Sequence, residues 1–145
     1  MKLDDLDLKI IDELMKNSRL SMRELARLLN RSAPAISERI KQLESFGIIK
    51  GYTIQIDYGK VGYPVCCLFE VTIKGGQYDT FKKYVSNLPQ VEFCHRIAGS
   101  ACFVLKRYFH SLSDVEQFID EVSPFATTVT HVVFSSVETK PFISL

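Results

Sequence analysis

Four cysteines carry the most versatile chemistry in this sequence, because thiolates bind metals and form disulfides. They are Cys66, Cys67, Cys94 and Cys102, and no two of them have the C-x-x-C spacing of a zinc site or a redox pair. All four lie in apolar stretches that predict β-strands. We therefore expect reduced thiols in the core, with no disulfide and no bound metal, as in proteins of a reducing compartment.

The histidines give no catalytic arrangement either. His95, His110 and His131 fall on separate predicted elements, which favours structural or surface roles over metal ligation. The sequence has no nucleophile elbow, no phosphate-cradling glycine loop and no zinc-hydrolase motif. We therefore predict a protein that is not an enzyme and needs no cofactor.

The basic residues are concentrated in one segment. The net charge of the chain is +1, but residues 16–50 hold eight Lys and Arg against three acids, a net charge of +5. Residues 1–15 have a net charge of −3 and residues 61–145 of −1. A localised basic segment predicts a surface that binds a polyanion, although charge alone leaves an ordinary solvated helical face as the alternative.

Three helices must position this basic segment. Leu6, Ile10 and Leu14 (with Ile11 and Met15) form one apolar stripe behind an acidic first turn. A second short helix begins at the capping box of Ser21 and Glu24 and buries a stripe that consists of Met22, Leu25, Ala26 and Leu29. A third begins at Ser32, buries Ile36, Ile40 and Leu43, and stops at Gly47.

The third helix has an outward face with small residues at its start. Pro34, Ala35, Glu38, Lys41 and Gln42 lie opposite the predicted core positions. Small side chains at the start of a helix form a narrow surface, which we call the leading edge. Such a surface suits a helix whose first turns enter the DNA major groove, so the pattern is typical of a helix-turn-helix. A three-helix bundle without a DNA role stays open on pattern alone. The run from 48 to 57 predicts an extended wing or a strand that leads out of the domain.

The rest of the chain predicts a second domain. Gly59, Gly62 and Pro64 punctuate a linker between residues 57 and 64. After it we expect strands at 65–73, 91–97, 101–106 and 129–137, and helices with apolar stripes at 81–88 (Phe81 to Leu88) and at 112–122 (Leu112, Val115, Phe118, Ile119 and Val122). The order βαββαβ is the ferredoxin-like arrangement. We thus predict an α+β protein with domains at 1–60 and 61–145.

One face of the predicted sheet is left without helices. Apolar residues expected there are Cys66, Leu68, Val104, Val132 and Phe134. An uncovered apolar sheet face favours pairing with a second copy of the chain.

The first domain resembles a known family in many positions at fixed spacing. The matching residues are Leu3-Asp4-x-x-Asp7-x-x-Ile10-Ile11, Arg19-Leu20-Ser21, Glu24-Leu25-Ala26, Ser32 with Arg39, Leu43-Glu44 and Gly47-Ile48-Ile49-x-Gly51-Tyr52. They are similar to the Lrp/AsnC (leucine-responsive, feast-famine) regulators. The resemblance implies a winged helix-turn-helix with a recognition helix from Ser32, followed by an ACT-like effector and assembly domain. It also implies homodimers through the C-terminal domain, which often form octamers as tetramers of dimers.

The resemblance assigns DNA contacts to residues of the basic segment. Base edges would be approached by Ser32, Ala33, Pro34, Ala35, Ser37 and Glu38, and bases or flanking phosphates by Lys41 and Gln42. Phosphates would be bound by Arg23, Arg27, Arg31 and Lys50. Two roles stay open for Arg39, which either contacts a phosphate or pairs with a neighbouring acid such as Glu44.

The resemblance also directs attention to a small-molecule site. In the family, the turn between the middle strands has a glycine followed by acidic residues, but here it reads Gly99-Ser100-Ala101-Cys102. A carboxylate that would pair with a ligand ammonium is missing. If an amino-acid effector binds, the positions expected to contact it are Gly99, Ser100, Cys102 and Thr130.

We therefore expect a sequence-preferring regulator that binds double-stranded DNA. The alternatives are an architectural protein that bends or wraps DNA with weak sequence preference, and a metabolite-sensing module whose first domain contacts proteins. The N-terminus begins directly with an acidic amphipathic pattern, and no apolar run reaches the roughly 20 residues that a membrane span needs. We accordingly expect a cytoplasmic, nucleoid-associated protein without a membrane partner.

Overall fold

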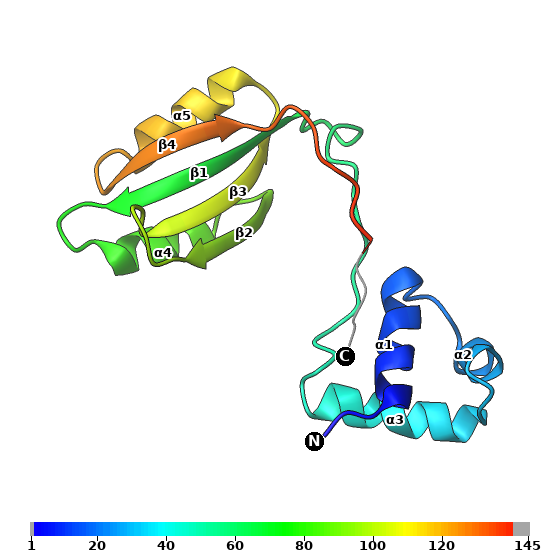
Figure 1. The fold of residues 1–145 in the computed structure, drawn as a ribbon. Helices are drawn as coiled ribbons and strands as arrows, with labels where there is room; N and C mark the ends of the chain where they lie inside the picture. Colours follow the sequence, from blue (N-terminus) through cyan, green and yellow to red (C-terminus); the bar gives the residue numbers. More distant parts are fainter. Residues whose placement is uncertain (1, 141–145) are drawn as a thin grey trace. The chain divides into compact units, whose positions relative to one another are not determined.

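The computed structural model describes residues 2–140, which form two compact units (Figure 1). The first unit extends to Gln55 and includes residues 138–140, and the second runs from Ile56 to Val137. No helix among residues 2–140 is both long and apolar enough to cross a membrane.

The first unit contains the three predicted helices, α1 (Asp5–Lys16), α2 (Met22–Leu28) and α3 (Ala33–Ser45). They pack around fully buried side chains of Ile10, Leu25, Ile36 and Leu43. The predicted capping box starts α2, since the Ser21 amide donates to Glu24 at 2.7 Å and the Glu24 amide donates to the Ser21 hydroxyl oxygen at 3.2 Å. The stripe of α1 differs from the prediction at its end, where Met15 is exposed.

Two left-handed residues set the ends of α2 and α3. Asn30 has φ 51° and Gly47 has φ 69°. The amide of the residue after each of them donates a hydrogen bond to a carbonyl of the preceding helix. The Arg31 amide donates to the Ala26 carbonyl at 2.8 Å, and the Ile48 amide donates to the Leu43 carbonyl at 2.9 Å. These are Schellman closures, and the one at Asn30 makes the tight turn between α2 and α3.

The expected wing is not formed as a strand. No strand lies between Ser45 and Val65, all of whose residues the structure describes. A strand requires a partner for its amides and carbonyls, and residues 51–57 have no ladder partner among the described residues.

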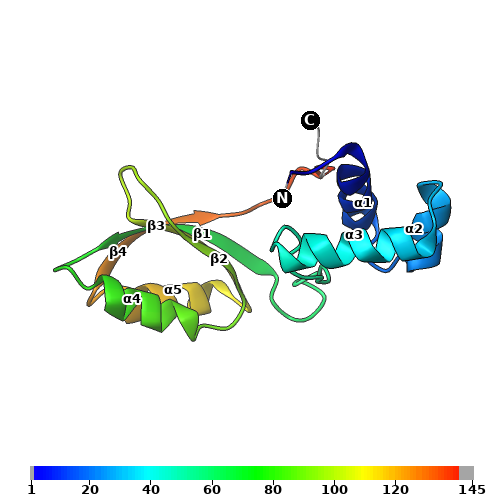
Figure 2. The ribbon, with the colours of Figure 1, turned by 90° about the horizontal axis from the view of Figure 1, so that it is seen from below.

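The second unit has the predicted order β1 (Val65–Ile73), α4 (Tyr78–Ser86), β2 (Val91–Arg96), β3 (Phe103–Phe109), α5 (Leu112–Val122) and β4 (Ala126–Val132). Its sheet has the order β2-β3-β1-β4, and every neighbouring pair is antiparallel. Figure 2 shows α4 and α5 on one face of this sheet. The ferredoxin-like prediction is confirmed.

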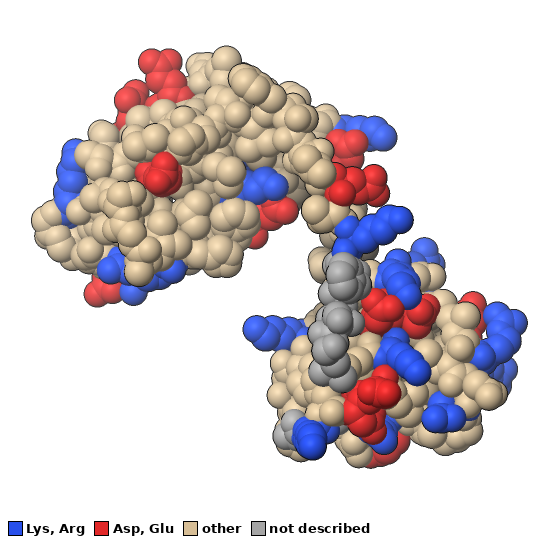
Figure 3. Space-filling view, viewed as in Figure 1, with Lys and Arg blue, Asp and Glu red and all other residues tan. Residues whose placement is uncertain are grey.

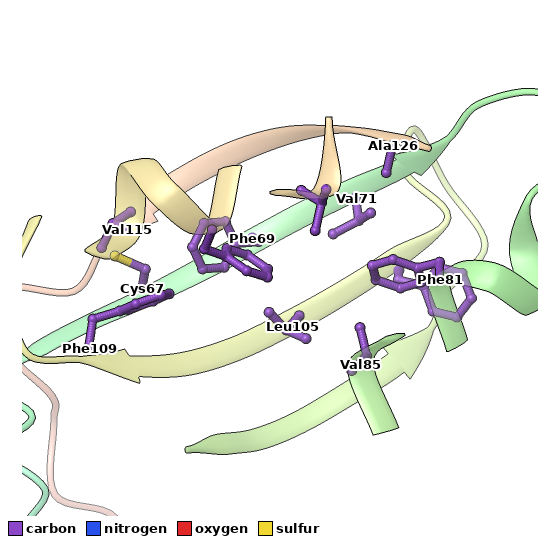
Figure 4. Close-up of a cluster of buried hydrophobic side chains, with 12 residues drawn as sticks. Cys67, Phe69, Val71, Phe81, Val85, Leu105, Phe109, Val115 and Ala126 are labelled. Carbon is purple, nitrogen blue, oxygen red and sulfur yellow. The ribbon is translucent and has the colours of Figure 1, made fainter. Parts of the chain in front are cut away.

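The core of the second unit lies between the sheet and the two helices (Figure 4). Cys67, Phe69 and Val71 alternate into it from β1, as predicted, and meet Phe81 of α4 and Phe118 of α5. The predicted stripe of α5 was wrong at Leu112, which is 64% exposed because the first residue of this helix lies outside the core.

The predicted bounds of the last strand, 129–137, were wrong at both ends. The strand begins at Ala126, which pairs with Ile73 and is buried, and it ends at Val132, which pairs with Cys67. Its partner β1 begins at Val65, directly after Pro64, so the ladder cannot continue far beyond Val132. The third strand also runs further than predicted, to Phe109.

The helix-free sheet face differs in two residues from the prediction. Val132 lies opposite Cys67 and therefore shares the helix-covered side, and Phe134 lies beyond the strand. Leu68, Val104 and Cys66 do lie on the helix-free side, together with Val129. The face is less apolar than expected, because His131 contacts Glu70 at 2.7 Å and Lys106 contacts Glu92 at 2.7 Å there.

The predicted linker is an ordered turn of the second unit. The Tyr63 amide donates to the Tyr58 carbonyl at 2.8 Å, and the Tyr58 ring stacks on Tyr108 of β3 with centroids 3.8 Å apart. The expected boundary after residue 60 lies inside this turn, whereas the two units divide between Gln55 and Ile56.

Candidate nucleic-acid interface

Helix α3 has a buried side and an open side. Ile36, Ile40 and Leu43 are buried against α1 and α2, whereas the expected base-reading positions Pro34, Ala35, Glu38 and Lys41 are exposed. Gln42 is half-buried and donates to the Glu38 carboxylate at 3.3 Å. Ala33 and Ser37 are half-buried at the margin of the exposed face.

Ser32 has a structural role at the start of this helix. Its hydroxyl oxygen accepts the Ala35 amide at 3.4 Å, which caps α3. Because this oxygen acts as an acceptor, the hydroxyl hydrogen stays available as a donor to an external group. Pro34 occupies the second helical position, where its missing amide costs no helix hydrogen bond.

Arg39 pairs with two acids at the start of α1, the N-cap residue Asp4 and Asp7 of the first turn. Its Nη1 lies 2.7 Å from Asp4 Oδ2 and 3.0 Å from Asp7 Oδ1, and Asp7 is fully buried. These contacts raise the pKa of Arg39, with the Asp4 hydrogen bond as the largest cause. The expected partner Glu44 was wrong: it accepts the Tyr52 hydroxyl at 2.8 Å instead. The pairing with two acids favours the structural alternative for Arg39.

The acidic partners of Arg39 also cap α1. The Asp4 side chain accepts the amides of Leu6 and Asp7, and Asp7 in turn accepts the Asp4 amide at 3.0 Å. The helix dipole, which was the reason predicted for these acids, accounts for only part of their role, and the link to α3 was not predicted. The signal was present in the spacing of Asp4 and Asp7, which is that of a capping box.

The cations that are expected to bind phosphates lie on the surface of the first unit. Arg23, Arg27 and Arg31, together with Lys50, are exposed. In the part of the chain that the structure describes, the side chains of Arg23 and Arg27 make no ion pair, so they are free for external anions. Figure 3 shows Lys and Arg side chains over much of the first unit, with acidic side chains among them.

The four expected effector positions do not lie together. Gly99, Ser100 and Cys102 share the turn between β2 and β3, where the Ile97 amide donates to the Cys102 carbonyl at 3.0 Å. Thr130 lies on β4 opposite Phe69, and β1 separates its strand from β3. The Cys102 thiol lies 3.5 Å from the Tyr78 hydroxyl, which is the largest cause of a lowered Cys102 pKa.

A helix-turn-helix followed by a ferredoxin-like domain defines a class of transcription regulators. Residues 3–50 match the family model of a winged helix-turn-helix DNA-binding domain, and residues 66–141 match that of the Lrp/AsnC ligand-binding domain. The chain belongs to the Lrp/AsnC family of helix-turn-helix transcription regulators, which are not enzymes.

Individual relatives support this assignment over the whole length. The chain is 56% identical to the HTH-type transcriptional regulator LrpC of Bacillus subtilis over 140 residues, which cover 97% of each protein. The solved structure of LrpC has a TM-score of 0.94 and covers 97% of this chain and all of its own. A feast or famine regulatory protein of M. tuberculosis (Rv3291c), complexed with L-methionine, is 25% identical with a TM-score of 0.88, covering 95% of this chain and 96% of its own.

Proposed function

We propose that the chain regulates transcription by binding double-stranded DNA in a sequence-preferring way, with α3 in the major groove. The observation that carries this proposal is the exposed leading edge of α3, where Pro34 and Ala35 leave the helix slim enough to approach base edges. The opposite side of the helix is held by its buried apolar residues and by the Arg39 ion pairs. A rigidly held, slim helix is what base reading requires.

Each side chain has a proposed role in the complex. Base edges are contacted from Ser32, Ala33, Pro34, Ala35, Ser37, Glu38, Lys41 and Gln42. Phosphates are bound by Arg23, Arg27, Arg31 and Lys50, which are exposed cations. Arg39 positions α3 through Asp4 and Asp7.

We infer that the second unit pairs two copies of the chain through the helix-free sheet face. Leu68 and Val104 are half-buried there and Val129 is 56% exposed, so this apolar area is not covered by the chain itself. Pairing would give a homodimer, and further assembly to an octamer would place several DNA-binding units on one particle. Several linked units raise avidity for DNA that carries neighbouring sites.

We also propose that a small molecule such as an amino acid regulates the protein. The complex of the M. tuberculosis relative with L-methionine supports an amino-acid effector. The turn at Gly99, Ser100 and Cys102 remains a candidate contact region, whereas Thr130 lies on a separate strand.

A genome-wide footprint, recorded with and without added amino acids, tests the proposal. We expect protection at discrete sites that share a sequence element, and a changed set of protected sites with one of the amino acids. Uniform protection, or protection that follows only DNA curvature, would show an architectural protein instead.

A further inference from the structure

A cavity of about 250 Å³ lies in the second unit, beside the end of β3 and along one side of α5. We call it the Arg107 cavity. Its polar lining comprises Gln90, Arg107, His110, Asp114, Gln117 and Glu121, and Tyr63 and Tyr108 contribute aromatic rings. It lies at the Phe109 end of β3, whereas the turn with Gly99 precedes Phe103 at the other end.

Arg107 is an unusual residue at its position. Its Cα pairs with that of Cys67, so its side chain starts on the helix-covered side of the sheet, and burial lowers its pKa. The guanidinium carbon lies 4.8 Å from the ring centroid of Phe109 and 5.0 Å from that of Phe118. A planar cation stacked on two rings is fixed in orientation.

The hydrogen-bonding capacity of this guanidinium is mostly unused. Its Nε donates to the Pro89 carbonyl at 3.3 Å. Among the described residues, its two terminal nitrogens have no hydrogen-bond partner, and no carboxylate lies within 4.0 Å of them. A guanidinium presents its donors as a fork that matches a carboxylate in a bidentate way.

Acidic groups lie on another wall of the same cavity. Asp114 and Glu121 are two helical turns apart on α5, with Gln117 between them. Glu121 accepts the Tyr84 hydroxyl at 2.6 Å and the Gln117 amide at 2.9 Å, and the Tyr84 contact is the largest cause of its lowered pKa. Within the described chain, the Asp114 carboxylate has no ion-pair partner. The cavity therefore presents a cation and a carboxylate that do not neutralise each other directly.

We propose that the Arg107 cavity binds a small zwitterion of the α-amino acid class. The ligand carboxylate would be held by the fork of Arg107, and the ligand ammonium by Asp114. A volume of about 250 Å³ is just below the range of pockets for drug-sized ligands, which suits a single amino acid. The proposal rests on the amino-acid effector of the proposed function and assigns it a site away from the Gly99 turn, and it does not depend on DNA binding.

Isothermal titration calorimetry on the full chain tests this site. The probes are the twenty standard amino acids one at a time, followed by two derivatives of any that binds. One derivative is the amine that lacks the carboxylate, and the other is the N-acetyl form that lacks the ammonium. We expect at least one amino acid to bind, and each derivative to bind at least about tenfold more weakly, a loss of about 1.4 kcal/mol. Absence of heat with all twenty would overturn the proposal.

Variants locate the bound molecule. Asp114→Asn and Arg107→Gln should each weaken binding by about tenfold or more, and Arg107→Lys, which keeps the charge but loses the fork, should weaken it less than Arg107→Gln. Glu116→Gln is the matched control, since it removes a charge from an exposed position of α5 outside the lining, and Ser100→Ala controls for the Gly99 turn. Unchanged binding in Asp114→Asn and in both Arg107 variants would place the ligand elsewhere. Circular dichroism identifies any variant that fails to fold. If the Arg107 variants do not fold, the binding measured with Asp114→Asn alone tests whether the ligand occupies the cavity.

Discussion

The guanidinium of Arg39 on α3 lies 3.0 Å from the carboxylate of Asp7 on α1, which is fully buried. Asp7 also accepts the Asp4 amide at 3.0 Å, so one acidic side chain both caps α1 and holds α3. Loss of Arg39 would leave the buried Asp7 carboxylate without its cationic partner, and an uncompensated buried charge costs more than the hydrogen bond itself contributes.

Asp7→Ala should loosen α3 without touching its exposed face. We expect the free energy of opening of the first unit to fall by about 1–3 kcal/mol, the usual cost of a lost buried hydrogen bond. Hydrogen exchange at the α1 and α3 amides measures this change. Asp5→Ala is the control, because Asp5 is exposed in the same helical turn. Equal effects of the two substitutions would show that the contact between Asp7 and Arg39 does not stabilise the first unit.

The caps of α1 and α2 predict a loss of stability in acid. The Asp7 amide lowers the pKa of Asp4 from its ordinary 3.8, and the hydrogen bonds of Ser21 lower the pKa of Glu24 from its ordinary 4.5. A carboxyl whose pKa is lowered by folding stabilises the fold above its unfolded value, and that stability disappears as the pH falls through the folded value. The first unit should therefore open more readily as the pH falls from about 4.5.

Acid titration of the opening equilibrium, followed by hydrogen exchange, checks this dependence. The variant Asp4→Asn with Glu24→Gln should be less stable at neutral pH and should show a shallower loss in acid. A slope identical to that of the unchanged chain would assign the acid response to other carboxyls.

The exposed leading edge of α3 predicts an effect on DNA that is separate from stability. Ala35→Glu adds bulk and negative charge at an exposed position, so we expect affinity for a preferred site to fall by about tenfold or more, the size of one lost base contact. Fluorescence anisotropy measures the affinity. Ser45→Glu, at an exposed position at the far end of α3, is the control and should cause a smaller loss. A larger loss from the control would place the interface elsewhere.

Arg23, Arg27 and Arg31 should contribute through phosphates. Replacement of each by Gln should weaken binding to all sequences alike and reduce the slope of log affinity against log salt by about 0.9. Affinities between 50 and 200 mM salt, a range over which phosphate contacts change binding strongly, measure the slope. A change in sequence preference without a change in slope would contradict the phosphate role.

The helix-free sheet face predicts a defined assembly defect. Leu68→Glu places a carboxylate on that face in both copies. We expect the dissociation constant of the dimer to rise on the order of a hundredfold, because like charges would meet in the interface. Sedimentation equilibrium measures it. Leu112→Glu, which adds the same charge at an exposed leucine of α5, should leave the assembly unchanged. An unaffected oligomer in Leu68→Glu would exclude this face.

The features that the sequence predicts well are those set by local chemistry. Capping residues and apolar periodicity place α2 and α3, because Ser21, Ser32 and Gly47 act within a few residues of themselves. The strands of the second unit are also predicted well, because buried side chains alternate with more exposed ones along a strand, as they do around Phe69 in β1.

Features that depend on distant partners were harder to predict. The end of β4 depends on where β1 begins, more than sixty residues earlier, and the alternation of its own residues does not carry that information. The partner of Arg39 is likewise 32 residues away, so the nearby Glu44 was the wrong choice. The Arg107 cavity combines residues from four separate segments, none of which carries a motif by itself.

The most direct test of DNA reading by α3 is the ratio of affinities for a selected site and for a scrambled duplex of equal composition. Both are measured at physiological salt with the unchanged chain and with Ala35→Glu. We predict a ratio of at least about a thousand for the unchanged chain, within the usual range for specific binders, and a much smaller ratio for the variant. Absence of duplex binding, or equal affinity for both duplexes, would contradict a sequence-preferring regulator.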